Sequence, residues 1–202
     1  MNKKYLFLAL LMLLLATGLL ILPERHNFQQ MKAENLMWEV VQPTRYVTVD
    51  QVAMMIIDGD PTLELVDVRP INDFATFSLK NAINIPFDSL LNPNYQGYLG
   101  IEDMNVVFYS NDDIRADQSW VIARRMGYHN LYVMKGGLNS WIECIIKPLK
   151  PDETASLNEF EDYEFRKGAS IYFTGAKLES SDKKSSVNVV RRKKGSAVAG
   201  GC

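Results

Sequence analysis

The sequence predicts an α/β protein in which helices cover both faces of a parallel sheet. Two observations predict this class. Short runs of apolar and β-branched residues, such as "LELVDVR" at 63–69 and "NVVFY" at 105–109, alternate with segments of helical pattern. These runs are apolar almost throughout, which is typical of strands buried on both faces. Strands separated by helices imply right-handed crossovers, so we expect one α/β domain over residues 46–147.

The elements of this domain follow one another in a regular order. Tyr46 and Val47 suit a short strand, and Thr48 with Gln51 forms a capping box that opens a helix ending at Gly59. The next expected elements are a strand at 63–69, a short helix at 71–77, a strand at 82–86 and a turn into "FDSLL". A strand at 105–109, a helix at 115–127, a strand at 130–134 and a helix at 138–146 complete the domain.

The N-terminal stretch 1–22 has the composition of a membrane segment. Lys3 and Lys4 precede an uncharged apolar run over 5–22, whose length approaches the hydrocarbon thickness of a bilayer. With the lysines held in the cytoplasm, the sequence predicts a single-pass anchor in the cell membrane, with the rest of the chain on the extracytoplasmic side. A cleaved signal peptide is the alternative, because the small residues 16–18 have suitable spacing.

Three further segments flank the domain. Residues 23–45 are expected to form a spacer that leans on it. Residues 148–176 contain a second capping box, Ser156 with Glu159, and predict an amphipathic extension that covers the domain. Residues 177–202 are polar and basic, cannot bury a core, and predict a flexible tail that ends in Cys202.

Charge and histidine content exclude two classes of function. The formal net charge of −2 argues against general nucleic-acid binding. The two histidines, His26 and His129, lie far apart in the sequence and form no pair with metal-ligand spacing. We therefore expect no metal site of this type and no cofactor.

Three stretches, in this order, carry a more specific signal: "LVDVRPINDF" at 65–74, "NAINIP" at 81–86 and "GYHNLYVMKGGLNSW" at 127–141. Together they resemble a rhodanese-like domain, the sulfurtransferase fold, over about half of the chain. The resemblance implies that Asp67 and Arg69 tie loops together at a strand end. The apolar N-terminus and the C-terminal extension are similar to those of membrane-tethered bacterial rhodanese-like proteins.

The resemblance also identifies a loop. In this family the loop after the fourth strand begins with a cysteine and ends with an arginine, and its backbone N–H groups stabilise a thiolate or persulfide. Alignment on "VVFYSNDDIRAD" places Ser110 at the cysteine position and Arg115 at the arginine position. The usual histidine before the third strand is replaced by Ser78. The active-site-like loop comprises Ser110, Asn111, Asp112, Asp113, Ile114 and Arg115.

This loop predicts that sulfurtransferase activity is lost. The pKa of a serine hydroxyl is far above neutral, and a serine oxygen cannot hold a sulfane sulfur. Asp112 and Asp113 would also repel the anions that the family binds. We expect no catalytic residue and interpret the chain as a pseudoenzyme, a binding or regulatory module for an unknown protein partner.

Two alternatives stay open at this stage. Cys202, or less plausibly Cys144, could supply a thiol for sulfur transfer or act as a sulfur carrier, although Cys144 has the pattern of a small buried hydrophobe beside Trp141. Oxygens of Asp112, Asp113 and Asp117 could bind a cation such as calcium. The competing interpretation of these carboxylates is a solvated loop in which Asp112 or Asp113 pairs with Arg115.

Overall fold

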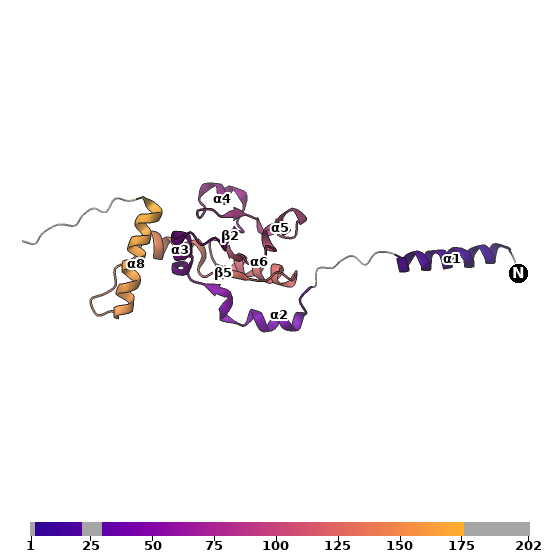
Figure 1. Cartoon of the computed structure of the whole chain (residues 1–202), viewed down its shortest axis with the longest axis horizontal. Helices are drawn as coiled ribbons and strands as arrows, with labels where there is room; N and C mark the ends of the chain where they lie inside the picture. The colour runs from indigo at the N-terminus through magenta and orange to yellow at the C-terminus, as the bar shows by residue number, and fades with distance from the viewer. Residues whose placement is uncertain (1–2, 22–29, 176–202) are drawn as a thin grey trace, which may run out of the picture.

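The computed structural model describes residues 3–21 and 30–175, and it contains the predicted parallel sheet (Figure 1). The strands are β1 (Tyr46–Val47), β2 (Leu63–Asp67), β3 (Ile83–Asn84), β4 (Asn105–Tyr109) and β5 (Leu131–Met134). They pair in the order β1-β5-β4-β2-β3, and every pairing is parallel. β4 lies in the middle, where Val66 of β2 and Val133 of β5 align with Phe108.

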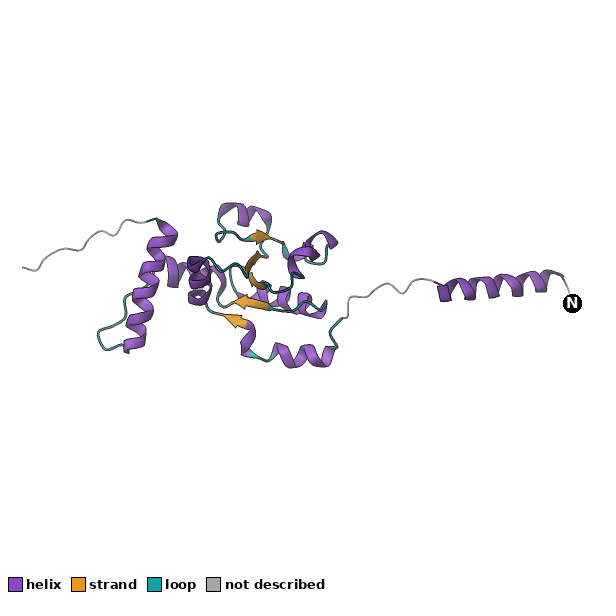
Figure 2. Ribbon diagram, viewed as in Figure 1, coloured by secondary structure: helices purple, strands orange, loops and turns teal. Residues whose placement is uncertain are grey.

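Helices connect these strands (Figure 2). The α-helices are α1 (Lys3–Ile21), α2 (Ala33–Val40), α3 (Val49–Asp58), α4 (Ile71–Thr76), α5 (Gln96–Leu99), α6 (Asp113–Arg125), α7 (Gly137–Ser140) and α8 (Leu157–Thr174). Short 3-10 turns are η1 (Pro43–Arg45), η2 (Phe87–Ser89) and η3 (Pro93–Tyr95), and the π-helix η4 (Trp141–Ile146) follows α7 directly.

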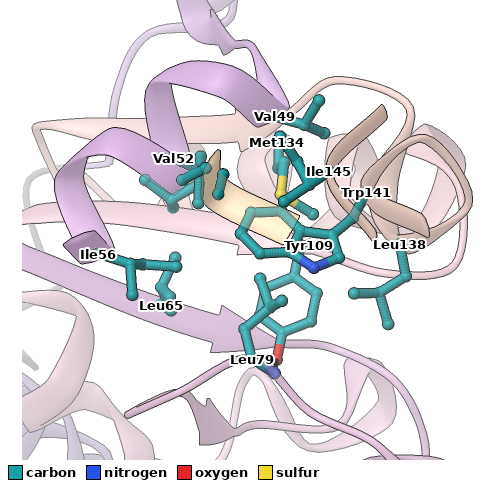
Figure 3. Packing of buried hydrophobic residues seen from close by; sticks show 13 residues of the cluster. Val49, Val52, Ile56, Leu65, Leu79, Tyr109, Met134, Leu138, Trp141 and Ile145 are labelled. Carbon is teal, nitrogen blue, oxygen red and sulfur yellow. Dashed lines mark hydrogen bonds between the residues drawn. The ribbon is translucent and has the colours of Figure 1, made fainter. Parts of the chain in front are cut away.

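Two hydrophobic clusters, one on each face of the sheet, confirm the prediction of a doubly covered sheet. On one face, Leu65, Val107 and Met134 pack against α3, α7, η4 and α8. Figure 3 shows Leu65 and Met134 within this cluster. On the other face, Val66 and Phe108 pack against α6 and α2. Neighbouring strand residues thus point to opposite faces and are buried on both, which explains their continuous apolar runs.

Capping boxes place the helix starts where the sequence predicts them. Thr48 Oγ1 accepts a hydrogen bond from Gln51 N–H at 3.1 Å, and Gln51 Oε1 accepts from Thr48 N–H at 2.8 Å. Ser156 donates its hydroxyl and its backbone N–H to Glu159 Oε1 at the start of α8. Gly59 ends α3 in the left-handed conformation, with φ of 67°.

The C-terminal extension packs on the face that carries α3 and η4. Arg166 of α8 donates to both carboxylate oxygens of Asp50 on α3, at 2.8 and 2.6 Å. The ring of Phe173 meets Trp141 edge to face, with 4.9 Å between ring centroids. α8 therefore adds a further layer to this face of the domain.

The N-terminal part differs from expectation in one respect. α1 coincides with most of the apolar run at 5–22. Within residues 3–21 and 30–175, however, no helix combines the length and the apolar character that a bilayer crossing needs. The predicted transmembrane helix is therefore not supported.

In the predicted spacer at 23–45, helix α2 packs on α6, and Glu39 of α2 forms an ion pair with Arg124 of α6. The tail from residue 177, with Cys202, lies outside the described residues.

Candidate functional site

The predicted loop lies at the carboxyl edge of the sheet, where α/β proteins bind their ligands. Ser110 follows the last residue of the central strand β4, is 3% exposed, and leads through Asn111 and Asp112 into α6. All six residues of the loop are thus close together in the chain, at the N-terminal end of a helix of 13 residues.

Backbone contacts with the start of α7 fix the path of this loop. Leu138 N–H donates to Ser110 O at 2.9 Å, and Asn139 N–H donates to Asn111 O at 3.0 Å. Gly137 makes this approach possible, because a Cβ atom there would lie 2.6 Å from Ser110 O. Its φ of 55° also favours glycine.

The two carboxylates of the loop accept hydrogen bonds from backbone N–H groups. Asp112 is the N-cap of α6, and its Oδ1 accepts from Ile114 N–H at 3.0 Å. Asp113 Oδ1 accepts from Gly136 N–H, which belongs to the turn after β5. The ion pair that the sequence suggested between Arg115 and one of these carboxylates is absent from the described part of the chain.

Ile114 and Arg115 face solvent. Ile114 is 64% exposed, and Arg115 is also exposed. At the same edge, just beyond β2, Ile71 is 60% exposed. Because β2 and β4 are neighbours in the sheet, the exposed side chains of Ile71, Ile114 and Arg115 all belong to the carboxyl edge of the sheet.

Asp67 and Arg69 form a buried ion pair that contacts the loop at Asn111. The Asp67 carboxylate is fully buried, and Arg69 donates to it from Nη2 at 2.6 Å and from Nε at 3.0 and 3.1 Å. Arg69 Nη1 also donates to Asn111 Oδ1 at 3.2 Å, and Nη2 donates to Phe77 O at 2.5 Å. Burial alone would lower the pKa of Arg69, but the hydrogen bonds and charge of Asp67 outweigh this effect and raise it.

Ser110 has no histidine beside it in the loop. His129, which precedes β5, is the histidine that the structure describes, and its Nδ1 lies 2.8 Å from Arg124 Nη1, at the other end of α6. Ser78, which the sequence resemblance predicts at a histidine position, is half-buried after α4. Proton abstraction from Ser110 by a neighbouring imidazole therefore has no support among these residues.

The three aspartates of the calcium hypothesis have separate partners. Asp117 accepts from Arg45 Nε at 3.1 Å and from the Tyr46 hydroxyl at 2.6 Å, whereas Asp112 and Asp113 bind backbone N–H groups. Within 3–21 and 30–175, no group of three or more His, Cys, Asp or Glu side chains is placed to hold a metal ion.

The remaining candidate residues lie in the core or outside the described part of the chain. Cys144 is half-buried in η4, carries a free thiol and packs against the α3 face of the core. Trp120 and Trp141 are both buried in the core. Sequence reasoning did not find the Asn111–Arg69 hydrogen bond, because its partners are 42 positions apart.

Tyr109, the last residue of β4, leads to a prediction on alkaline stability. Its buried hydroxyl accepts from Leu79 N–H at 3.2 Å, and burial, followed by the charge of Asp67, raises its pKa strongly. The unfolded chain ionises this tyrosine near pH 10 and the folded chain does not, so its contribution to stability is full below pH 10 and falls above it. In Tyr109→Phe, the alkaline loss of unfolding free energy should be shallower by about 1.4 kcal/mol per pH unit.

Urea unfolding at several pH values between 9 and 12 measures this slope. Equal slopes for the native chain and Tyr109→Phe would contradict the prediction. At pH 7 the same variant should lose about 1–2 kcal/mol, because the buried Leu79 N–H is left without its acceptor.

Comparison with known proteins agrees with this geometry. Residues 48–144 match the family model described as a rhodanese-like domain. A thiosulfate:glutathione sulfurtransferase of Saccharomyces cerevisiae is 27% identical over 93 residues, which cover 41% of this chain and 67% of that protein. A probable molybdopterin-synthase adenylyltransferase of Pyropia yezoensis is 26% identical over 103 residues, 50% of this chain. The chain spans only 26% of that longer protein.

Two solved structures are also similar to about half of this chain. A human single-domain sulfurtransferase is 23% identical, with a TM-score of 0.41 over 48% of this chain and 95% of that one. A rhodanese-related protein of Thermoplasma volcanium is 21% identical, with a TM-score of 0.41 over 48% of this chain and 90% of that one.

Proposed function

We propose that the rhodanese-like domain of this chain, residues 48–144, is a protein-binding platform in which the loop from Ser110 to Arg115 does not catalyse sulfur transfer. One observation carries the proposal. The Asp112 carboxylate occupies the N-terminus of α6 and accepts the Ile114 N–H. A helix N-terminus that would otherwise attract an external anion is thus bound by an anion of the protein itself.

The chemistry of Ser110 supports the same proposal. The resemblance of the loop to the family's loop puts this residue at the cysteine position, and an oxygen cannot carry a persulfide. A serine nucleophile would need a base, and the one described histidine lies at the far end of α6. Asp113 adds a second carboxylate beside Gly136, which disfavours a thiosulfate anion by Coulomb repulsion.

The exposed side chains at this edge suit a protein partner. Ile114 and Ile71 offer apolar contacts, and the exposed Arg115 is not engaged in an ion pair within the described residues. Arginine beside apolar anchors is typical of side chains that contribute strongly to interfaces. The rigid backbone contacts with Gly137 keep this surface in place, so little ordering entropy is lost on binding.

Sulfur transfer through another thiol is the second candidate function. The similarity to a sulfurtransferase favours it. The position of Cys144 weakens this candidate, because its side chain packs against the core. Cys202 lies outside the described residues, so the structure bears on Cys144 alone. Attachment to a membrane through residues 5–22 and an extracytoplasmic location remain predictions of the sequence.

We expect no thiosulfate sulfurtransferase turnover that depends on Ser110. Native protein and Ser110→Ala should give equal rates at the background of the assay, with a sulfurtransferase of the family as positive control. Ser110→Cys should restore little, because Asp112 and Asp113 disfavour a thiolate at this place. A measurable rate that Ser110→Ala abolishes would show that the loop is catalytic.

Partner binding is tested by affinity capture and cross-linking with native protein and a loop variant. Asp112→Asn, Asp113→Asn and Arg115→Gln change the charges but keep side-chain size and the capping acceptor. Lys150→Gln, Asp152→Asn and Glu153→Gln form a matched control, since these residues are exposed before α8. A partner kept by the control and lost by the loop variant supports the platform. Partners held equally by both variants would place the function elsewhere.

A further inference from the structure

A second concave site lies at the opposite end of the central strand from the loop. It has a volume of about 640 Å³ and is bounded by α3, the turn after it, and the sheet. Asn105, the first residue of β4, contributes to its wall, whereas Ser110 follows the last residue of that strand. Its size falls in the range of ligand-binding pockets.

The lining of this cavity is mainly apolar, with acidic groups at one side. Met54, Met55 and Tyr132 supply apolar surface, and Met54 is half exposed. Asp58 and Asp60 add two carboxylates. Asp60 is held by Thr62, whose N–H and hydroxyl each donate to Oδ1 at 2.8 Å, and these hydrogen bonds lower its pKa. The cavity therefore suits an occupant that has small apolar side chains followed by cations.

The last 27 residues of the chain have this composition. They hold seven of the 22 basic residues and two of the 24 acidic ones, so the rest of the chain carries a net charge of −7. Within them, "VNVVRRKK" at 187–194 places three valines directly before four cations. The sequence thus combines apolar and basic character in the order that the cavity can accommodate.

The end of α8 lies near the cavity, so the chain beyond Gly175 is long enough to reach it. Tyr172 accepts a hydrogen bond from Lys80 at 3.2 Å, and Lys80 lines a neighbouring cavity that shares Met55 and Asp60 with the first. Val187 lies twelve positions after Gly175, and an extended chain over twelve positions reaches about 40 Å. A tethered segment at such range has an effective concentration of about 1 mM.

We propose that residues 187–194 bind in this cavity, with the valines against Met54 and Tyr132 and the cations beside Asp58 and Asp60. The loop edge is the less favourable place for the segment, because it exposes Arg115 and Lys135, which repel the basic run. The proposal concerns a different surface from the loop and does not depend on the function proposed for it.

Amide hydrogen exchange of the purified full chain tests this contact. For a segment that binds with a dissociation constant near 0.1 mM, exchange over residues 54–60 should be about tenfold slower than in a chain whose tail does not bind. Two full-length variants remove binding: one in which Val187, Val189 and Val190 become Ser, and one in which 191–194 become Gln. A synthetic peptide of residues 185–196 should restore protection when added to the serine variant.

A matched pair of substitutions locates the site. Met54→Arg places a positive charge in the cavity and should abolish the protection, whereas Met37→Arg, on the exposed side of α2, should leave it unchanged. Both methionines are at least half exposed, so neither change removes core packing. Unchanged exchange in the tail variants would refute the proposal. The proposal would also be refuted if the Gln variant lost protection while the Ser variant kept it fully. That result would show that the tail is attracted by charge alone and that its valines do not bind in the cavity.

Discussion

Arg69→Met should destabilise the domain by about 3–5 kcal/mol, because it leaves the fully buried Asp67 carboxylate without its guanidinium. The side chain also loses its bonds to Asn111 Oδ1 and Phe77 O, so the active-site-like loop loses a support. This is a large part of the 5–15 kcal/mol that typically separates a folded domain from its unfolded state. The midpoint of urea unfolding measures the change.

Two further variants separate a buried charge from a general effect of removing an arginine. Arg115→Met makes the same substitution at an exposed position and should change stability by less than about 0.5 kcal/mol. Arg69→Met combined with Asp67→Asn should be more stable than Arg69→Met alone, because the double variant buries an amide in place of an unpaired charge. A double variant that is less stable than the single one would contradict this account.

Gly137→Ala should cost about 2–4 kcal/mol and move the loop. The added methyl group would lie 2.6 Å from Ser110 O and 2.8 Å from both Asn111 C and Asn111 O, all of them backbone atoms. The backbone of Gly137 also has a positive φ, which an alanine adopts only with strain. We expect a lower thermal midpoint and faster exchange of Leu138 N–H, which donates to Ser110 O.

Gly168→Ala is the matched control for this substitution. Gly168 lies inside α8, and a Cβ atom there would meet nothing within 4 Å. Alanine favours the helix over glycine, so this variant should be more stable by about 0.5–1 kcal/mol. If both glycine variants lost stability to the same extent, the close approach of Gly137 to the loop would not be the cause.

Local sequence signals predicted much of this fold because the forces behind them are local. The runs that became β2 and β4 are mainly apolar, and Thr48 and Gln51 lie within one helical turn of each other. The π-helix at Trp141–Ile146 was not predicted, since the same residues read as an ordinary helix. Strand β3 is two residues long, shorter than expected, because only Ile83 and Asn84 pair with β2.

The candidate site was predictable in position and not in detail. Its place after the central strand follows from the order of elements, but the partners of its side chains come from distant segments. Asp113 binds Gly136, 23 positions away, and Asn111 binds Arg69. A sequence pattern that considers neighbours alone pairs Asp113 with Arg115 instead. The cap formed by Asp112 was open to prediction, because an aspartate at the start of a helical pattern is a common N-cap.

The burial of the tryptophans gives this chain an intrinsic optical probe on each side of its sheet. Trp120 lies in the cluster beneath α6 and Trp141 in the cluster beneath α8, whereas Trp38 on α2 is 72% exposed. A Trp38→Phe background thus leaves two buried indoles, and single replacement of either one isolates the fluorescence of one face. Coincident fluorescence transitions would show that the two halves of the core melt as one cooperative unit, and separate transitions would show that one face can open while the other holds.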